Sequence, residues 1–280
     1  MKNQRISKQA WILFSIFFTT VTTSHVTAQE TSLSFGAARS FGINGVTHPL
    51  FEQSEITGSV TSATAKRVTP STGYNVRWEL NHYLNEYVGI GFHGTLIRGN
   101  WQHFSSERKI VFVQHTARSI KCNGFSLAAN LLVRFPNEYV SPYFSLMPGF
   151  FSGYLDIHDT VTYSEALTAS VWKYTGMNSF FLGMVAGADI HLNDHLALFV
   201  QAELINFTTS PQRGRLITRN GSDFLDNIPT SEKRIVFVEH MSSDYNQLVD
   251  ESLPTQILKP YFNHDSFQLR IGFRVVFGYR

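Results

Sequence analysis

A carboxylate and a histidine two positions apart are the first candidates for chemistry in this sequence. Asp189 and His191 alternate with apolar residues, so on an extended strand their side chains share one face, about 7 Å apart by strand rise. A histidine with a carboxylate and a serine within hydrogen-bond reach is the arrangement of nucleophilic catalysis. No serine can be assigned to this pair without knowledge of strand pairing, and a purely structural pair is the alternative interpretation.

Metal binding, thiol chemistry and nucleic-acid binding have little support. His115 and His240 end two nearly identical decapeptides, but no nearby spacing matches a metal-ligand pattern. Cys122 is the single cysteine, which excludes an intrachain disulfide and a CxxC metal site. The 23 Lys and Arg against 21 Asp and Glu give a net charge of +2, without the basic footprint of a nucleic-acid-binding protein. We therefore expect no metal, no cofactor and no nucleic-acid partner.

The elements that position these side chains follow an N-terminal export signal. A basic head (residues 2–8) precedes a short apolar run (residues 11–21), and the small residues of "VTA" end at Ala28. This is the anatomy of a secretory signal peptide, and the apolar run is too short to span a bilayer comfortably as a helix. The sequence predicts a removed signal peptide over residues 1–28 and a single domain over residues 29–280.

Long stretches of alternating apolar and polar residues dominate the rest of the chain. From Phe267 to Tyr279 every odd-numbered residue is apolar or aromatic. Period two over this length predicts a strand with one apolar face, and a tilted strand that crosses a membrane needs about nine to eleven residues. Eight segments follow this pattern, the first one least clearly: residues 32–42, 74–80, 87–97, 122–135, 139–154, 178–192, 195–207 and 266–280.

The connections between these segments alternate in length. Short turns fall near residues 84–85, 136–138 and 193–194. Long excursions fall at residues 43–71, 100–121, 156–176 and 209–264. Short turns on one side and long loops on the other are typical of outer-membrane barrels, whereas a soluble sandwich gives no reason for this asymmetry. The sequence predicts an all-β, eight-stranded antiparallel transmembrane up-and-down β-barrel with long extracellular loops, located in a bacterial outer membrane.

The last strand carries a family resemblance. The stretch "RIGFRVVFGY" resembles the C-terminal assembly signal of bacterial outer-membrane barrels, which is carried here by Arg270, Gly272, Phe273, Val275, Phe277 and Tyr279. The ending departs from that signal because Arg280 follows the final aromatic residue. The whole pattern resembles the small eight-stranded OmpA/OmpX/OmpW-type barrels. The resemblance implies contact with outer-membrane lipid and transient partnership with the barrel-assembly machinery and periplasmic chaperones; it brings no catalytic motif.

Charged residues fall on the inward faces of the expected strands. An eight-stranded barrel is only wide enough inside for side chains to fill, and buried charges must be paired. We expect a salt-bridged polar plug that fixes strand register; a narrow ion or solute path is the alternative. The inward set comprises Arg77, Glu79, Arg134, Asp189, Glu203, Arg270 and Arg274, with Asn130, Gln201 and Gln268.

A repeated decapeptide suggests where a partner binds. "SERKIVFVQH" (residues 106–115) and "SEKRIVFVEH" (residues 231–240) fall in the second and fourth excursions. "IVFV" is strongly β-forming and apolar on both faces, so each copy is predicted to continue the barrel wall or to form a hairpin above the membrane. Asn220-Gly221 supplies a plausible hairpin turn. The expected function is structural or surface interaction with an extracellular or envelope partner, without catalysis. A narrow small-solute or ion channel is the first alternative, and a lipid-modifying barrel enzyme is a distant one.

Overall fold

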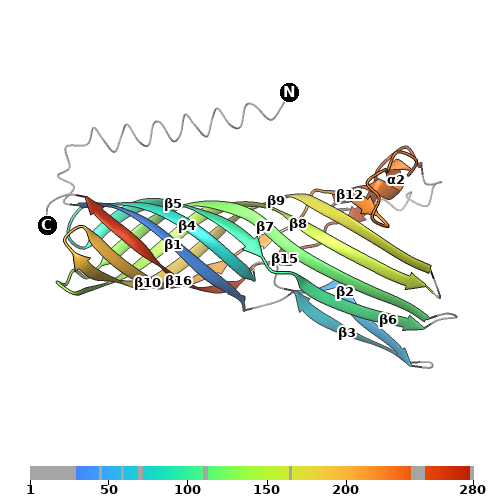
Figure 1. The fold of residues 1–280 in the computed structure, drawn as a ribbon, viewed down its shortest axis with the longest axis horizontal. Coiled ribbons are helices and arrows are strands. Elements are labelled where there is room, and N and C mark those ends of the chain that lie inside the picture. The colour runs from blue at the N-terminus through green and yellow to red at the C-terminus, as the bar shows by residue number, and fades with distance from the viewer. Residues whose placement is uncertain are drawn as a thin grey trace.

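A computed structural model of the chain describes residues 30–43, 46–57, 60–68, 72–109, 113–163, 166–240 and 250–277. The expected signal peptide, and Tyr279 of the expected assembly signal, lie outside the described residues. The described chain is almost entirely β-strand (Figure 1). Within it, no helix has the length and apolar character needed to cross a membrane.

Eight antiparallel strands pair in a closed ring (Figure 1). The ring runs β10–β16–β1–β4–β5–β7–β8–β9 and closes where β9 pairs with β10. The strands are β1 (Glu30–Gly42), β4 (Gly73–Tyr83), β5 (Val88–Gly99), β7 (Val113–Arg134), β8 (Val140–Tyr163), β9 (Ala166–Asn193), β10 (Leu196–Asn206) and β16 (Ser266–Phe277). The predicted eight-stranded antiparallel barrel is confirmed, and over the described residues each alternating segment of the sequence lies in one of these strands to within about two residues at its ends.

The period-two pattern sets the two faces of the wall. In β16 the even-numbered residues from Ser266 to Val276 are buried, and odd-numbered ones such as Ile271 and Phe273 are exposed. The exposed set is apolar, as a lipid-facing band requires. β1 begins and β16 ends at the end of the barrel that carries the short turns, because Thr31 pairs with Phe277 there (Figure 1).

Three strands rise far beyond the other five. β7, β8 and β9 contain 22, 24 and 28 residues, whereas the other barrel strands contain 11 to 13. The expectation that residues 100–121 and 156–176 form loops is therefore corrected: most of these residues extend the wall on one side (Figure 1). In these extensions the outward residues are no longer consistently apolar. β-Branched and aromatic residues, as in "HDTVTY" and "SVWKYT", still favour the extended chain.

Shorter elements complete the external half of the molecule (Figure 1). β6 pairs with β7, β2 pairs with β3, β12 joins β9, β13 lies between β12 and β14, and β11 pairs with β15. Their bounds are β2 (Val46–Thr57), β3 (Val60–Val68), β6 (Gln102–Lys109), β11 (Thr208–Thr209), β12 (Arg213–Arg219), α2 (Thr230–Lys233), β13 (Arg234–Val238), β14 (Thr255–Leu258) and β15 (Phe262–Asn263). The four-residue α2 is the only helix among the described residues.

The two decapeptide copies adopt different structures. The first bends into the β6–β7 hairpin, where Glu107 faces His115 and residues 110–112 lie outside the described part of the chain. In the second copy α2 leads directly into β13, which continues the barrel wall. The predicted turn is present, since Asn220 and Gly221 both have positive φ and Arg219 exchanges two backbone hydrogen bonds with Ser222. At the described positions, nearly identical local sequence thus adopts different secondary structure in different surroundings, as expected when tertiary context outweighs intrinsic propensity.

Candidate functional site

The inward strand faces gather the charged residues of the lumen. All seven that the sequence analysis named are at most 6% exposed, and Asn130, Gln201 and Gln268 are buried with them. Glu30, which that analysis missed, is also buried and shares the even-numbered inward face of β1. Extending the alternation of the predicted first strand, residues 32–42, by two residues would have found it. In the membrane-spanning part, four arginines thus face four carboxylates.

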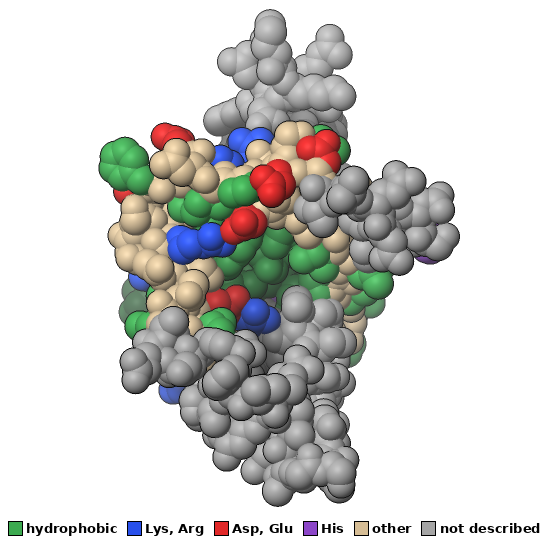
Figure 2. Space-filling view, turned by 90° about the vertical axis from the view of Figure 1, so that its right-hand side faces the viewer, with side chains coloured by type: hydrophobic (Ala, Val, Ile, Leu, Met, Phe, Trp, Pro, Cys, Tyr) green, Lys and Arg blue, Asp and Glu red, His purple; other side chains and the backbone are tan. Residues whose placement is uncertain are grey.

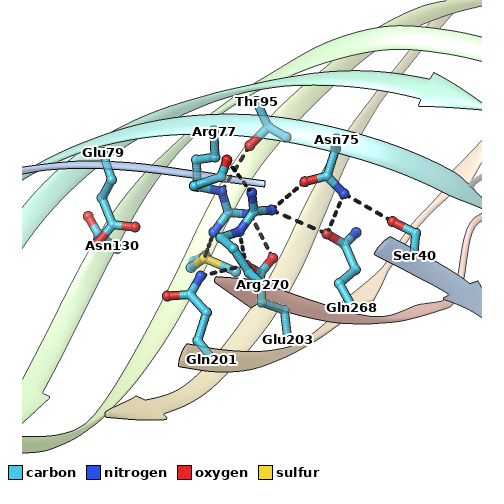
Figure 3. Close-up of polar contacts among 12 residues, drawn as sticks. Ser40, Asn75, Arg77, Glu79, Thr95, Asn130, Gln201, Glu203, Gln268 and Arg270 are labelled. Atoms are coloured by element: carbon cyan, nitrogen blue, oxygen red, sulfur yellow. Dashed lines mark hydrogen bonds and ion pairs between the residues drawn. The ribbon is translucent and has the colours of Figure 1, made fainter. Parts of the chain in front are cut away.

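At the centre of the lumen one carboxylate lies between two arginines (Figure 3). Glu203, which is fully buried, accepts hydrogen bonds from Arg77 Nη2 at 2.7 Å and Arg270 Nε at 2.6 Å. Gln201 Nε2 donates to the same carboxylate at 2.5 Å, and Arg77 Nε donates to Thr95 Oγ1 at 2.9 Å. Charge-assisted bonds of this kind offset the cost of removing the ions from water.

The network continues toward the external side through neutral groups (Figure 3). Arg270 Nη2 donates to Asn75 Oδ1 at 2.5 Å, and Asn75 Nδ2 donates to Gln268 at 2.9 Å and to Ser40 at 3.0 Å. These contacts connect β16, β4 and β1. A one-residue slip of any of these strands would turn its polar residues toward lipid, so the network specifies strand register.

Arg274 and Arg134 form three further ion pairs at the end of the lumen near the short turns. Arg274 pairs with Asp189, donates to Ser34 Oγ at 2.9 Å and has its Nη2 3.7 Å from Glu79 Oε1. Arg134 makes a bidentate pair with Glu30. The sequence anticipated paired charges but not their partners, because those are set by which strands adjoin.

A serine does lie beside His191. Ser141 Oγ is 2.8 Å from His191 Nε2, and it also donates to the backbone carbonyl of Asn137 at 3.2 Å. Ser141 is 1% exposed, and the carboxylate of Asp189 is bound to Arg274. A nucleophile needs access to substrate and a base oriented for proton transfer, and this buried serine has no such access. The geometry fits a structural pair.

Other candidate residues do not assemble into a site. Cys122 is a buried free thiol. His93 is buried beside the arginine cluster, and neither of its ring nitrogens has a hydrogen-bond partner. Among the described residues, no three His, Cys, Asp or Glu side chains lie close enough to hold a metal ion. The side chain of His115 is outside that description, so the structure does not test whether His115 and His240 could share a metal ion.

Aromatic side chains pack together in the lumen on the external side of the polar network. Phe207 stacks on His264 with ring centroids 4.5 Å apart and contacts Phe151 at 4.9 Å and Phe181 at 5.8 Å. We call these four residues the aromatic layer. This layer was not predicted. The pairs Phe150-Phe151 and Phe180-Phe181 nevertheless carry a signal for it, because adjacent strand residues face opposite ways and one ring of each pair must point inward.

A small cavity separates the two layers. Its volume is about 20 Å³, and Ser40 and Gln268 line it on the polar side while Phe207 and His264 line it on the other. This is the room for about one water molecule. Outside the aromatic layer, Figure 2 shows a hollow with hydrophobic side chains at its base and Lys, Arg, Asp and Glu side chains around it. The described lumen therefore contains a charged layer and an apolar layer in series.

His264 provides a pH test of the aromatic layer. Burial lowers the pKa of this histidine, which lies outside the membrane-spanning strands, to about 3. Between pH 6.5 and pH 3 the His264 side chain therefore binds a proton in the unfolded chain but not in the folded chain. The contribution of neutral His264 to folding stability is fully present above pH 6.5 and decreases as the pH falls below it. We expect His264→Phe to lose this component. From pH 6.5 to 4.5 the wild type should lose about 2 kcal/mol more than the variant in chemical denaturation; parallel losses would contradict the assignment.

The closed antiparallel ring with an apolar outer band and a polar lumen defines an integral outer-membrane β-barrel. The chain belongs to the outer membrane protein beta-barrel domain family, whose model matches residues 17–227. A search of curated protein sequences gave no match. The protein is located in the bacterial outer membrane, as its sequence predicts.

Three solved structures illustrate the similarity. OprG from Pseudomonas aeruginosa is 11% identical with a TM-score of 0.45, and the alignment covers 90% of this chain and 97% of that one. Ail, the attachment invasion locus protein of Yersinia pestis, is 13% identical with a TM-score of 0.30, at 90% and 100% coverage. Neisserial surface protein A is 10% identical with a TM-score of 0.31, at 88% and 95% coverage.

Proposed function

We propose that the protein is a non-conducting, non-catalytic outer-membrane barrel that acts through its external surface. The observation that carries this proposal is the filling of the lumen. Arg270 and Arg274 are among the largest fully buried side chains, and the aromatic layer lies between them and the external solvent. An eight-stranded barrel has room only for its own side chains, and here the charged ones form ion pairs with one another. The burial of Ser141, which leaves the Ser141–His191 pair without access to a substrate, supports a non-catalytic role.

The raised wall supports an interaction role. β12, β13 and β14 add to the sheet beyond β9, and β14 is the last strand of that sheet among the described residues. Beyond the aromatic layer the inner face of the wall is apolar, with Leu155, Ile157 and Phe237 in one buried cluster. A stiff sheet with an end strand can bind a partner strand through backbone hydrogen bonds. Surface binding to an extracellular or envelope partner is thus the function we propose.

A narrow channel is the second candidate. The cavity between the two layers favours it, because it interrupts the packing along the barrel axis. A path would need both layers to open, since Glu203 pairs two arginines on one side and Phe207 stacks on the other. Passage through a salt-bridged layer also requires those ion pairs to break. The two candidates therefore differ in a measurable property, the conductance of the folded barrel.

Single-channel recording of the refolded full chain in a planar bilayer tests the proposal. We expect no unitary currents from the wild type. We also expect none from Arg274→Ala, because the Glu203 ion pairs and the aromatic layer remain in place. Folding of each sample is established separately by resistance of the barrel to detergent denaturation without heating. Steady unitary currents from the wild type that change in size with Arg274→Ala would overturn the non-conducting assignment and favour the channel.

A further inference from the structure

The outer wall changes abruptly from apolar to cationic on the side where it is raised. On β5 and β7, Leu96 and Phe125 are register partners, and they are 69% and 43% exposed. The next outward residues along the same strands are Arg98 and Asn123, also register partners. Leu96 and Phe125 therefore end the lipid-facing band, and the membrane–water boundary falls between these two rows.

A groove of about 680 Å³ lies at this boundary. Leu96 and Phe125 line its apolar part, and Arg98, Lys121 and Asp156 line its polar part. The ammonium group of Lys121 lies 5.6 Å from the ring centroid of Trp101, an aromatic residue of the kind enriched at membrane interfaces. Within the described chain, neither Arg98 nor Lys121 is a member of an ion pair.

The groove begins a longer row of positive charge. Strand register aligns five outward-facing residues across β7, β8, β9, β12 and β13: Lys121, Asp156, Lys173, Arg215 and Arg234. Four cations and one acid give this row a net charge of +3. Asp156 separates Lys121 from Lys173, but Lys173, Arg215 and Arg234 are register neighbours of like charge, which repel each other. The row therefore favours an anionic ligand.

We propose that the groove binds the phosphorylated headgroup of an outer-leaflet lipid. Arg98 and Lys121 hold the phosphate, and an acyl chain of the same lipid lies along Leu96 and Phe125. Guanidinium and ammonium groups are the side chains best suited to phosphate. A soluble anion would use only the polar half of the groove, whereas a phospholipid or phosphorylated glycolipid matches both halves. This binding goes beyond the proposed surface interaction and does not depend on it.

Native mass spectrometry of the full chain in detergent micelles tests the lipid site. Phosphatidic acid and phosphatidylcholine with the same acyl chains are titrated separately, and the bound fraction gives each affinity. We expect phosphatidic acid to bind the wild type at least 10-fold more tightly, and Arg98→Gln/Lys121→Gln to lose at least 10-fold of that affinity. The conservative variant Arg98→Lys/Lys121→Arg should retain it, which separates loss of charge from damage to the wall.

A charge-matched control uses two cations elsewhere in the external half of the molecule. Arg219 and Lys259 pair with Glu232 and Glu239, away from the groove. Arg219→Gln/Lys259→Gln removes the same charge and should leave phosphatidic acid binding within about 2-fold of wild type. Equal losses in the groove and control variants would overturn the proposal, because they would reflect general charge. Inorganic phosphate that displaces the lipid at equal concentration would also overturn it, since the apolar half would then contribute nothing.

Discussion

Replacing Glu203 with alanine is expected to cost about 3–5 kcal/mol of unfolding free energy, the largest effect of any single carboxylate in the lumen. Glu203 is fully buried and neutralises both Arg77 and Arg270. Its removal leaves two guanidinium groups in a low-dielectric lumen with only neutral partners. Urea unfolding of the chain refolded into lipid vesicles measures the loss.

Two control variants define what the loss means. Glu232→Ala removes an exposed carboxylate that pairs with Arg219, and exposed pairs contribute less than about 1 kcal/mol. A triple variant, Arg77→Met/Glu203→Leu/Arg270→Met, removes the charges together and should recover most of the stability lost by Glu203→Ala. If Glu203→Ala cost no more than Glu232→Ala, the buried cluster would not stabilise the barrel. Failure of the triple variant to recover would indicate that the polar network, not charge balance, is what matters.

Replacing Phe207 with alanine is expected to destabilise the protein by about 3–5 kcal/mol, the range for a buried phenylalanine. Phe207 contacts the other three members of the aromatic layer and is 7% exposed, so its removal leaves a cavity beside an existing one. The polar network below has its own partners and should stay intact. The same urea unfolding measures the effect, and the variant should remain silent in the planar bilayer.

Phe180→Ala is the matched control for Phe207→Ala. Phe180 lies on the lipid-facing side of β9 and is 82% exposed. Lipid can fill the space that this ring leaves, so no lasting cavity forms and the loss should be clearly smaller. Equal losses from the two substitutions would mean that the aromatic layer is not packed as described. Unitary currents from Phe207→Ala alone would assign the barrier to that layer and not to the ion pairs.

Several features of this protein follow from local sequence. The alternation from Phe267 to Phe277 fixes which side chains of β16 face inward, because successive strand residues point to opposite faces. The same rule holds for Arg77, Glu79 and Glu203 on their own strands, whose burial needs only the period-two pattern. Strand number and the position of the short turns also follow, since both are marked by breaks in that pattern.

Other features needed contacts between distant residues. Glu203 meets Arg77 across 126 positions of sequence, and Arg134 meets Glu30 across 104. Whether Ser141 or another serine reaches His191 depended on the pairing of β8 with β9. The extension of β7, β8 and β9 was also not evident, because outside the membrane polar residues replace the apolar ones that mark a lipid-facing strand.

By itself, then, the sequence determined the barrel, its location in the outer membrane and the inward or outward face of most residues in the membrane-spanning strands. These depend on hydrophobic periodicity, which every short segment carries independently of the others. Only the tertiary structure decided which charges pair, that the aromatic layer packs beside the polar network, and that Lys121, Lys173 and Arg215 align on the outer wall. These depend on strand register and ring closure, which arise from contacts along the whole chain at once.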